Sequence, residues 1–270
     1  MIIVSLNIRG GGSRAKRKRV GYHIQKGEVD ICFVQETKLS GIDFNIVKEL
    51  WGDNQVEWSH LVANGASGGI LTMWKKDFFN LSFSFSGEGF FGLCVEKDGK
   101  RIYFVNVYAS CDLTTRKITW DRLYDLKNNN FKGSWCIGGD FNSISSLEGR
   151  IGMSTRSYRR EITIFKEFIE EMELVDLPTI GGKFTWIKIN GKTMSRLDRF
   201  LLSESFIEDW KVDGQHIGER DMSDHAPIWL KDNRKYWGPK PFKFNNMWFK
   251  HEDFDIFVEE DFDIFRMKWL

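Results

Sequence analysis

Apolar residues gather in short runs along most of the chain, and these runs have the length and the Val, Ile, Phe and Trp content of β-strands. Three longer stretches repeat apolar residues every three or four positions, which predicts amphipathic helices. The predicted strands cover residues 2–8, 31–36, 69–74, 81–86, 92–96, 101–108, 134–139, 183–189, 195–203 and 226–230. The predicted helices cover residues 15–26, about 114–128, and 157–172. Strands and helices mixed in this way predict an α/β fold.

Polar side chains stand at the ends or edges of these predicted strands. A buried polar group needs a hydrogen bond, an opposite charge or a metal, because leaving it unpaired costs roughly 2–7 kcal/mol. If the strand ends meet at one edge of a sheet, carboxylates, amides and one imidazole gather there, and this ligand set suits Mg²⁺. The residues concerned are Asn7, Glu36, Tyr108, Asp140, Asn142, Asp198, Asp224 and His225.

Each of these residues also has an ordinary structural interpretation. An Asp after a strand often caps a turn or a helix, Asn7 fits a loop amide, and Glu36 fits a cap for the segment that follows it. Asp224 next to His225 is the stronger single signal. The prediction of a metal site therefore depends on the residues as a set.

Composition and charge place the chain among globular proteins. With 270 residues, of which 41% are hydrophobic, it can bury a large core in one or two domains. The formal net charge is +1, but residues 251–270 carry seven acidic and two basic side chains, so the preceding residues are mildly basic. That balance favours a phosphate-bearing partner, although an ordinary soluble surface can carry the same charge.

The cysteines and the N-terminus predict an intracellular protein. Cys32, Cys94, Cys111 and Cys136 are scattered and form no CxxC pair, which disfavours zinc and a disulfide framework. The opening MIIVSL is too short for a signal peptide, and no stretch approaches the ~18 continuous apolar residues of a membrane span. We therefore expect no secretion and no membrane partner.

Three glycines at positions 10–12 precede the basic run SRAKRKR at 13–19. A phosphate-binding loop of the Walker A type is excluded because no GK[ST] follows. Since the run opens a predicted helix, a solvent-facing helix surface is favoured over a DNA contact or a nuclear-import signal.

Six segments in order resemble the endonuclease/exonuclease/phosphatase superfamily, which includes DNase I and the apurinic endonucleases. They are LNIRG (6–10), QETK (35–38), NVYAS (106–110), GGDFN (138–142), SRLDRFLLS (195–203) and SDHAPI (223–228). The resemblance is closest to the endonuclease domain of plant LINE-type non-LTR retrotransposons. It covers residues 1–230 as one domain and implies a four-layered α/β sandwich of two packed mixed sheets flanked by helices, as in DNase I.

The resemblance also implies a Mg²⁺-dependent endonuclease, with Mn²⁺ as a possible substitute, that nicks one DNA strand and leaves a 3′-hydroxyl. By position it assigns metal binding to Glu36, assisted by Asn7 and Asp224. It assigns the attacking water to Asp140 and Asn142, and the phosphate to Tyr108 and Thr185. His225 would stabilise the phosphoryl charge and Asp198 would orient it.

Two basic residues depart from the pattern of the relatives. Apurinic endonucleases have an Asp where this chain has Arg9, and Arg cannot bind a metal, so the difference favours the retrotransposon branch over abasic-site repair. Arg199 likewise follows Asp198. We expect Arg9 and Arg199 to contact DNA phosphates. DNA in turn suggests the nucleus as the site of action.

The last forty residues, 231–270, are expected to be a linker or a truncated downstream segment, since no reverse transcriptase domain follows. EDFDIF occurs at 252–257 and again at 260–265, and the apolar spacing predicts an acidic amphipathic helix over 252–270. Such a helix would dock on the domain or bind a protein partner. We otherwise expect a monomer.

Two other functions remain compatible with the sequence. One is a superfamily phosphatase acting on inositol phosphates or phospholipid headgroups, although no motif resembles the phosphatase-specific insertions. The other is a catalytically inactive relic that binds nucleic acid or protein. Retention of the acidic residues and of His225 argues against decay of the site.

Overall fold

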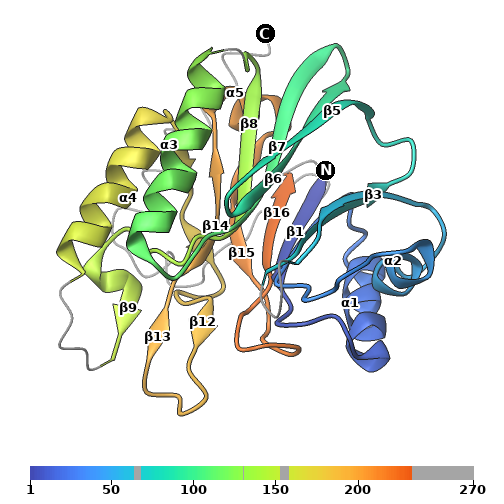
Figure 1. Cartoon of the computed structure of the whole chain (residues 1–270), viewed down its shortest axis with the longest axis horizontal. Coiled ribbons are helices and arrows are strands. Elements are labelled where there is room, and N and C mark those ends of the chain that lie inside the picture. The colour runs from blue at the N-terminus through green and yellow to red at the C-terminus, as the bar shows by residue number, and fades with distance from the viewer. Residues whose placement is uncertain (64–67, 130, 153–157, 233–270) are drawn as a thin grey trace, which may run out of the picture. The chain divides into compact units, whose positions relative to one another are not determined.

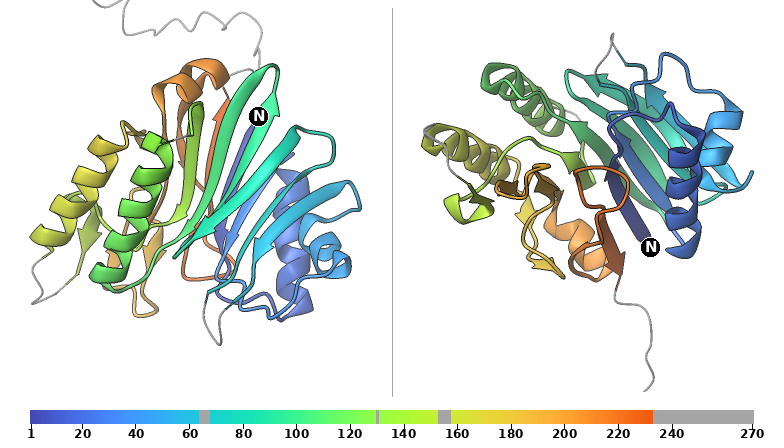
Figure 2. Two further views of the ribbon diagram at one scale, coloured as in Figure 1. Left: turned by 45° about the horizontal axis from the view of Figure 1, so that its top comes forward. Right: turned by 90° about the horizontal axis from the view of Figure 1, so that it is seen from below.

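Two β-sheets pack face to face between two pairs of helices in the computed structural model (Figure 1, Figure 2). The structure describes residues 1–63, 68–129, 131–152 and 158–232. Its helix, sheet, sheet and helix layers confirm the predicted four-layered α/β sandwich. The acidic helix predicted at 252–270 lies outside the described residues, together with the rest of 233–270.

The sheets are mixed, with strands far apart in sequence as neighbours. The first sheet has the order β11 (Thr179–Ile180), β15 (Val212–Ile217), β16 (Ile228–Asp232), β1 (Ile2–Asn7), β2 (Ile31–Gln35), β4 (Ile70–Lys75) and β3 (Val56–Leu61). The second has the order β10 (Val175–Asp176), β14 (Asp198–Leu202), β8 (Ser134–Asp140), β7 (Lys100–Tyr108), β6 (Phe90–Lys97) and β5 (Asn80–Gly87). A small third sheet joins β12 (Trp186–Ile187), β13 (Met194–Ser195) and β9 (Arg150–Ile151).

Helices cover the outer faces of the two large sheets (Figure 2). The first sheet is covered by α1 (Arg14–Lys26) and α2 (Phe44–Trp51), and the second by α3 (Leu113–Asn129) and α4 (Arg159–Glu171). The short α5 (Glu204–Trp210) connects β14 to β15, and a 3₁₀ turn, η1, spans Leu147–Gly149. Among the described residues no helix combines the length and the apolar character needed to cross a membrane.

Both faces of the central strands are buried, which explains their nearly continuous apolar runs. On β2, Phe33 belongs to the apolar cluster between the sheets, whereas its neighbours Cys32 and Val34 pack with residues of α1 and α2. The same alternation on β14 directs Phe200 between the sheets and Leu201 toward α3 and α4. The core is therefore three apolar layers, one between the two sheets and one between each sheet and its helices.

The predicted helices begin and end within two residues of the observed ones, and most predicted strands are present. Two strand predictions are wrong in extent. The run 183–189 forms only the two-residue β12, and 195–203 is interrupted at Arg196 and Leu197, where the chain passes from the small sheet into β14. The apolar pattern does not show this break, because both halves are buried.

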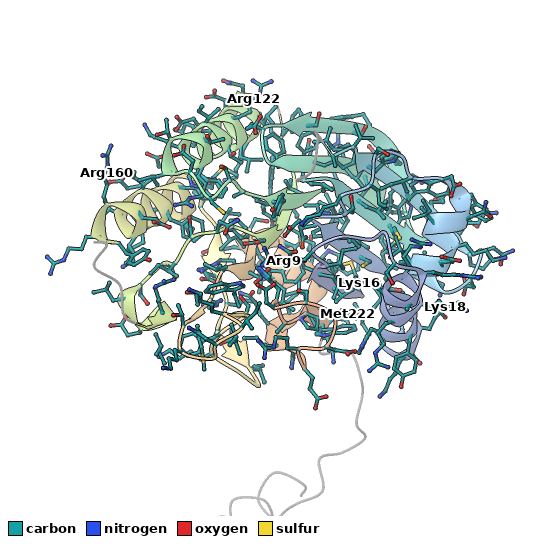
Figure 3. The ribbon with its side chains drawn as sticks, turned by 60° about the horizontal axis from the view of Figure 1, so that its bottom comes forward. Arg9, Lys16, Lys18, Arg122, Arg160 and Met222 are labelled. Carbon is teal, nitrogen blue, oxygen red and sulfur yellow. The ribbon has the colours of Figure 1, made fainter. Side chains whose placement is uncertain are left out.

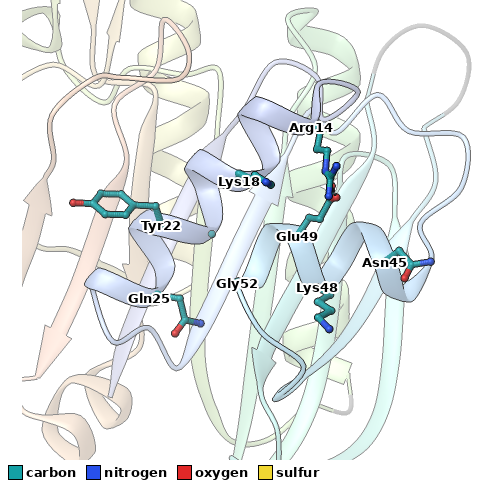
Figure 4. Close-up of a pocket in the computed structure, with 9 residues that line it drawn as sticks. Arg14, Lys18, Tyr22, Gln25, Asn45, Lys48, Glu49 and Gly52 are labelled. Atoms are coloured by element: carbon teal, nitrogen blue, oxygen red, sulfur yellow. Dashed lines mark hydrogen bonds and ion pairs between the residues drawn. The ribbon is translucent and has the colours of Figure 1, made fainter.

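The basic residues that open α1 are paired within the fold. Arg14 bonds one carboxylate oxygen of Glu49 on α2 at 2.7 Å (Figure 4). Arg17 bonds the other at 2.8 Å, and Arg19 bonds Asp221. The run thus fixes α1 against its neighbours. This arrangement favours the helix-surface interpretation over a DNA contact or an import signal.

Two glycines at the end of β8 allow the sheets and strands to approach closely. A Cβ on Gly138 would lie 2.3 Å from the Phe200 ring, and a Cβ on Gly139 would lie 2.0 Å from the carbonyl oxygen of Val107 on β7. Gly139 also has a φ of +143°, which L side chains rarely adopt. Residues with a side chain at positions 138 and 139 would push β8 away from Phe200 and Val107. The two glycines therefore allow the close packing that sets the position of the next residue, Asp140.

We expect Gly139→Ala to lower the free energy of unfolding by about 2 kcal/mol or more, because the new methyl group collides with backbone and the residue keeps an unfavourable φ. Urea denaturation measures the change. Gly12→Ala is the matched control, since its Cβ would meet nothing within 4 Å, and it should shift the free energy by less than about 0.5 kcal/mol. Equal stability of the two variants would contradict the close-approach argument.

Candidate active site

The predicted polar residues meet at one edge of the two large sheets, the lower edge in Figure 1. β1 and β2 are parallel, as are β7 and β8, so the carboxyl ends of all four strands reach that edge. Asn7 ends β1, Glu36 directly follows β2, and Tyr108 pairs with Asp140 in the register of β7 and β8. The start of β14 and the loop before β16 complete the site.

His225 lies between two buried carboxylates. Its Nδ1 is 2.9 Å from Oδ2 and 3.1 Å from Oδ1 of Asp198, and its Nε2 is 3.8 Å from Oδ2 of Asp140. Asp198 and Asp140 are themselves direct cross-strand neighbours on β14 and β8. None of the three side chains is more than 7% exposed. The structure thus brings together three of the predicted catalytic residues.

This arrangement keeps His225 protonated. Burial opposes the charged ring, but the carboxylates of Asp198 and Asp140 outweigh that effect and raise the pKa of His225 to about 9. Burial and the nearby negative charge of Asp198 raise the pKa of Asp140. The pKa of His225 lies above its ordinary value of 6.5, so the ion pairs of the charged ring stabilise the fold. That stabilisation is complete below about pH 6.5 and is lost as the pH rises through about 9.

Asp140 is also held by two amides. Its Oδ2 accepts a hydrogen bond from Nδ2 of Asn7 at 2.9 Å, and its Oδ1 accepts one from the backbone N–H of Asn142 at 2.9 Å. The side chain of Asn142 in turn donates to the carbonyl of Ala109 at 2.7 Å. Asp140 is therefore fixed in orientation at the end of β8.

Glu36 and Asp224 form a second carboxylate pair, with Arg9 between them. Arg9 Nη1 is 2.5 Å from Oδ2 of Asp224, and Arg9 Nε is 3.7 Å from Oε2 of Glu36. Lys38 also contacts Glu36, at 2.9 Å. Burial disfavours ionised Asp224, but the hydrogen bond from Trp186 and the nearby cations outweigh it and lower the pKa of Asp224.

The residues predicted to bind metal fit a divalent cation. Glu36 and Asp224 both contact the Arg9 guanidinium, so the two carboxylates face the same space in the site. Oδ1 of Asp224 is buried and has no hydrogen-bond partner among the described residues, which leaves a carboxylate oxygen free for a metal. Asp140, Asp198 and His225 offer ligand atoms that all lie within 4.8 Å of one another, but a protonated imidazole cannot bind a metal.

A cleft of about 270 Å³ is lined by Arg9, Glu36, Asp140, Asn142 and His225, among other residues. Arg9 lies near the centre of the face that contains the strand ends (Figure 3). Tyr108 lines the same cleft, and burial together with the charges of Glu36 and Asp140 raises its pKa, so its hydroxyl remains a donor. A larger hollow of about 560 Å³ between α1 and α2 contains none of these groups (Figure 4).

The prediction that Thr185 contacts phosphate is not supported, because the side chain is fully buried. Its Oγ1 accepts hydrogen bonds from the backbone N–H groups of Leu197 and Asp198, at 3.0 and 2.9 Å. Thr185 thus fixes the start of β14. It acts on the site only through the position of Asp198.

The prediction that Arg199 contacts DNA is wrong for the same reason. Arg199 is fully buried, packs over the Phe165 ring of α4, and bonds Asp176 at 2.9 Å and the carbonyl of Ser143 at 2.9 Å. Successive side chains of a strand point to opposite faces, so when Asp198 points into the cleft Arg199 must point toward α4. Arg9, in contrast, does lie in the cleft.

Two supporting residues were not predicted from the sequence. Trp186 donates from Nε1 to Oδ2 of Asp224 at 2.9 Å, and the Ser223 hydroxyl donates to the carbonyl of Asn7 at 2.7 Å. Ser223 also accepts a hydrogen bond from the backbone of His225. Both residues stand next to motif residues, in FTW and SDH, and that adjacency is the only sequence signal for them.

Asp198→Asn should lower the pKa of His225 by roughly one to three units, because burial then acts against the charged ring with one carboxylate fewer. Imidazole chemical shifts followed by NMR across a pH titration measure the change. Asp121→Asn removes an exposed carboxylate of α3 and should leave the pKa of His225 unchanged. An unchanged pKa in the Asp198 variant would refute the assigned cause.

Comparisons with known proteins agree with this geometry. Among solved structures, an apurinic endonuclease from Leishmania major is similar with a TM-score of 0.66 and 17% identity, covering 85% of this chain and 86% of that one. The endonuclease domain of TRAS1, a telomere-specific non-LTR retrotransposon, has a TM-score of 0.63 and 17% identity, with 87% and 99% covered. A 3′ phosphatase from Neisseria bound to a product DNA hairpin has a TM-score of 0.67 and 15% identity, with 86% and 99% covered. These likenesses establish the fold. A family model matches residues 4–225, so the chain belongs to the endonuclease/exonuclease/phosphatase family.

Proposed function

We propose that this protein is a divalent-metal-dependent DNA endonuclease that nicks one strand and leaves a 3′-hydroxyl. The observation that carries the proposal is the buried Asp198–His225 pair facing Asp140 beside a second carboxylate pair, Glu36 and Asp224. Phosphodiester hydrolysis needs a positioned water, a proton acceptor for it, and positive charge at the phosphate. The cleft contains a residue for each task.

Asp140 is the residue that positions and deprotonates water in this proposal. Asn7 and the backbone of Asn142 fix both of its oxygens, so the carboxylate keeps one orientation. As the water oxygen bonds to phosphorus, its proton passes to Asp140 and the bond from phosphorus to the 3′ oxygen breaks. The products are a 5′-phosphate and a 3′-hydroxyl, once a proton from solvent reaches the 3′ oxygen.

His225 stabilises the charge that develops on the phosphoryl oxygens. Asp198 holds Nδ1, which leaves the Nε2–H directed at the cleft beside Asp140. Tyr108 supplies a neutral donor in addition to the charged imidazole. A cation held by Glu36 and Asp224, with the Asn7 amide nearby, would supply further positive charge to the phosphate.

One feature supports the retrotransposon branch over abasic-site repair. Arg9 stands where apurinic endonucleases have an acidic residue. Magnesium is the proposed physiological cation and Mn²⁺ a substitute, because every ligand is an oxygen.

Purified protein should convert supercoiled plasmid to the relaxed form with Mg²⁺ or Mn²⁺, and EDTA should stop the reaction. Asp140→Ala and His225→Ala should each lower the rate by a factor of roughly 10² or more, the usual effect of losing a catalytic group. Asp121→Ala, an exposed substitution on α3, should retain the wild-type rate, and the two catalytic variants purified in the same way control for contaminating nucleases. Extension of the nicks by a polymerase measures whether a 3′-hydroxyl is present.

Nicking by both catalytic variants at the wild-type rate would refute the assignment. Hydrolysis of inositol phosphates or phospholipid headgroups without DNA cleavage would select the phosphatase alternative. DNA binding that weakens with salt, without cleavage over hours, would select the inactive relic.

A further inference from the structure

The guanidinium of Arg9 occupies the space between the two carboxylates assigned to metal binding. It lies 2.5 Å from Asp224 on one side and 3.7 Å from Glu36 on the other. The two carboxylates come from different parts of the first sheet, after β2 and before β16. Arg9 is therefore the bridge that connects them in this structure.

The carboxylates and the guanidinium differ in exposure. The side chains of Glu36 and Asp224 are 8% and 14% exposed, whereas that of Arg9 is 47% exposed. The Arg9 backbone is fixed by its N–H, which donates to Oδ1 of Asn7 at 3.1 Å. The guanidinium can thus turn outward into solvent without displacing any element, but the carboxylates cannot follow it.

A divalent cation and the guanidinium cannot occupy the same space between Glu36 and Asp224. Two partly buried carboxylates close together repel each other unless a positive charge compensates them. Arg9 supplies that charge without a metal. A bound metal would supply it instead, and would also repel the guanidinium.

We infer that Arg9 is an exchangeable counter-ion of the metal site, which holds Glu36 and Asp224 together before a divalent cation binds and moves outward when it does. This inference rests on the proposed metal-dependent function. It predicts that Arg9 weakens metal affinity, because each binding event must first break its two contacts. It also predicts that Arg9 lies at the mouth of the cleft, in solvent, in the metal-bound state.

Direct titration with Mn²⁺ in the absence of DNA tests the inference, with free Mn²⁺ measured by electron paramagnetic resonance. Arg9→Met should bind Mn²⁺ roughly tenfold more tightly than wild type, as expected when a competing charge in contact with both ligands is removed. Glu36→Gln combined with Asp224→Asn should abolish the binding and so assigns it to this site.

Two control variants separate the bridge from a general charge effect. Arg14→Met breaks the ion pair between Arg14 on α1 and Glu49 on α2 and should leave the affinity within about twofold of wild type. Lys38→Met removes a cation that contacts Glu36 alone, and its effect should be smaller than that of Arg9→Met. If Lys38→Met tightens binding as much as Arg9→Met, the bridging role is refuted.

Thermal unfolding gives a second measurement. Arg9→Met should unfold at a lower temperature than wild type without metal, and Mn²⁺ should raise its unfolding temperature by more than it raises that of wild type. If Arg9→Met does not fold without metal, Arg9→Lys replaces it. An ammonium group lacks the planar, forked donors of a guanidinium and holds the two carboxylates less firmly, so Arg9→Lys should still bind Mn²⁺ severalfold more tightly, and an unchanged affinity would refute the inference.

The inference and the proposed function fail in different ways. Unchanged or weaker Mn²⁺ binding by Arg9→Met, while wild type binds at Glu36 and Asp224, would refute the counter-ion role and leave the metal-dependent function intact. Binding by neither protein would refute both. Binding by Arg9→Met alone would support the counter-ion role in its strongest form.

Discussion

A protonated imidazole between two buried carboxylates is the interaction on which the site depends. Asp140 and Asp198 face each other across neighbouring strands, an arrangement that repulsion between like charges would ordinarily destabilise. Burial makes the conflict more severe, since neither is more than 3% exposed. His225 resolves it by approaching both carboxylates, so the loop that carries His225 is as necessary to the fold of this edge as to its chemistry.

The backbone at this edge is also unusual. Arg9, Glu36 and Asn142 follow three different strands and all have left-handed φ values, of 46°, 54° and 46°. Residues other than glycine rarely adopt this conformation, which costs roughly 1–2 kcal/mol each. A left-handed residue turns the chain sharply at the end of a strand and redirects the next side chain. The strained residues thus lie at the strand ends, where the regular alternation of side chains between the two faces of a sheet stops. Ending it there lets several polar side chains point into one cleft.

The sequence predicts the layers and most of the cleft, but not the direction of every side chain. Asn7, Glu36, Asp140 and His225 could be found because polar residues at the ends of buried strands are conspicuous and the strand ends of parallel pairs converge. Thr185 and Arg199 could not be judged, because their burial depends on which sheet each short strand joins. The run 195–203 contains a switch between sheets that no hydrophobic pattern records.

The sequence also could not show which carboxylates pair with the basic side chains of the motifs. Nothing in LNIRG indicates that Arg9 meets Asp224, since 215 positions separate them. The same is true of Arg199 and Asp176, whose pairing turns an expected DNA contact into a support for the second sheet. The role of a basic residue in such a motif therefore depends on the carboxylate that it contacts in the fold. That carboxylate lies in the cleft for Arg9 and in the second sheet for Arg199.

The two carboxylate clusters of the cleft differ in how their charge is compensated, and this difference follows from burial. His225 is enclosed and bonded to Asp198, so its positive charge stays in place whatever binds in the cleft. Arg9 is half exposed and attached to the cleft through a flexible side chain, so its charge can be replaced. In the proposed mechanism Asp140 and His225 keep one geometry to act on water and phosphate, whereas Glu36 and Asp224 accept an exchangeable ion. A fixed cation in the first cluster and a movable one in the second meet these two requirements at one edge of the fold.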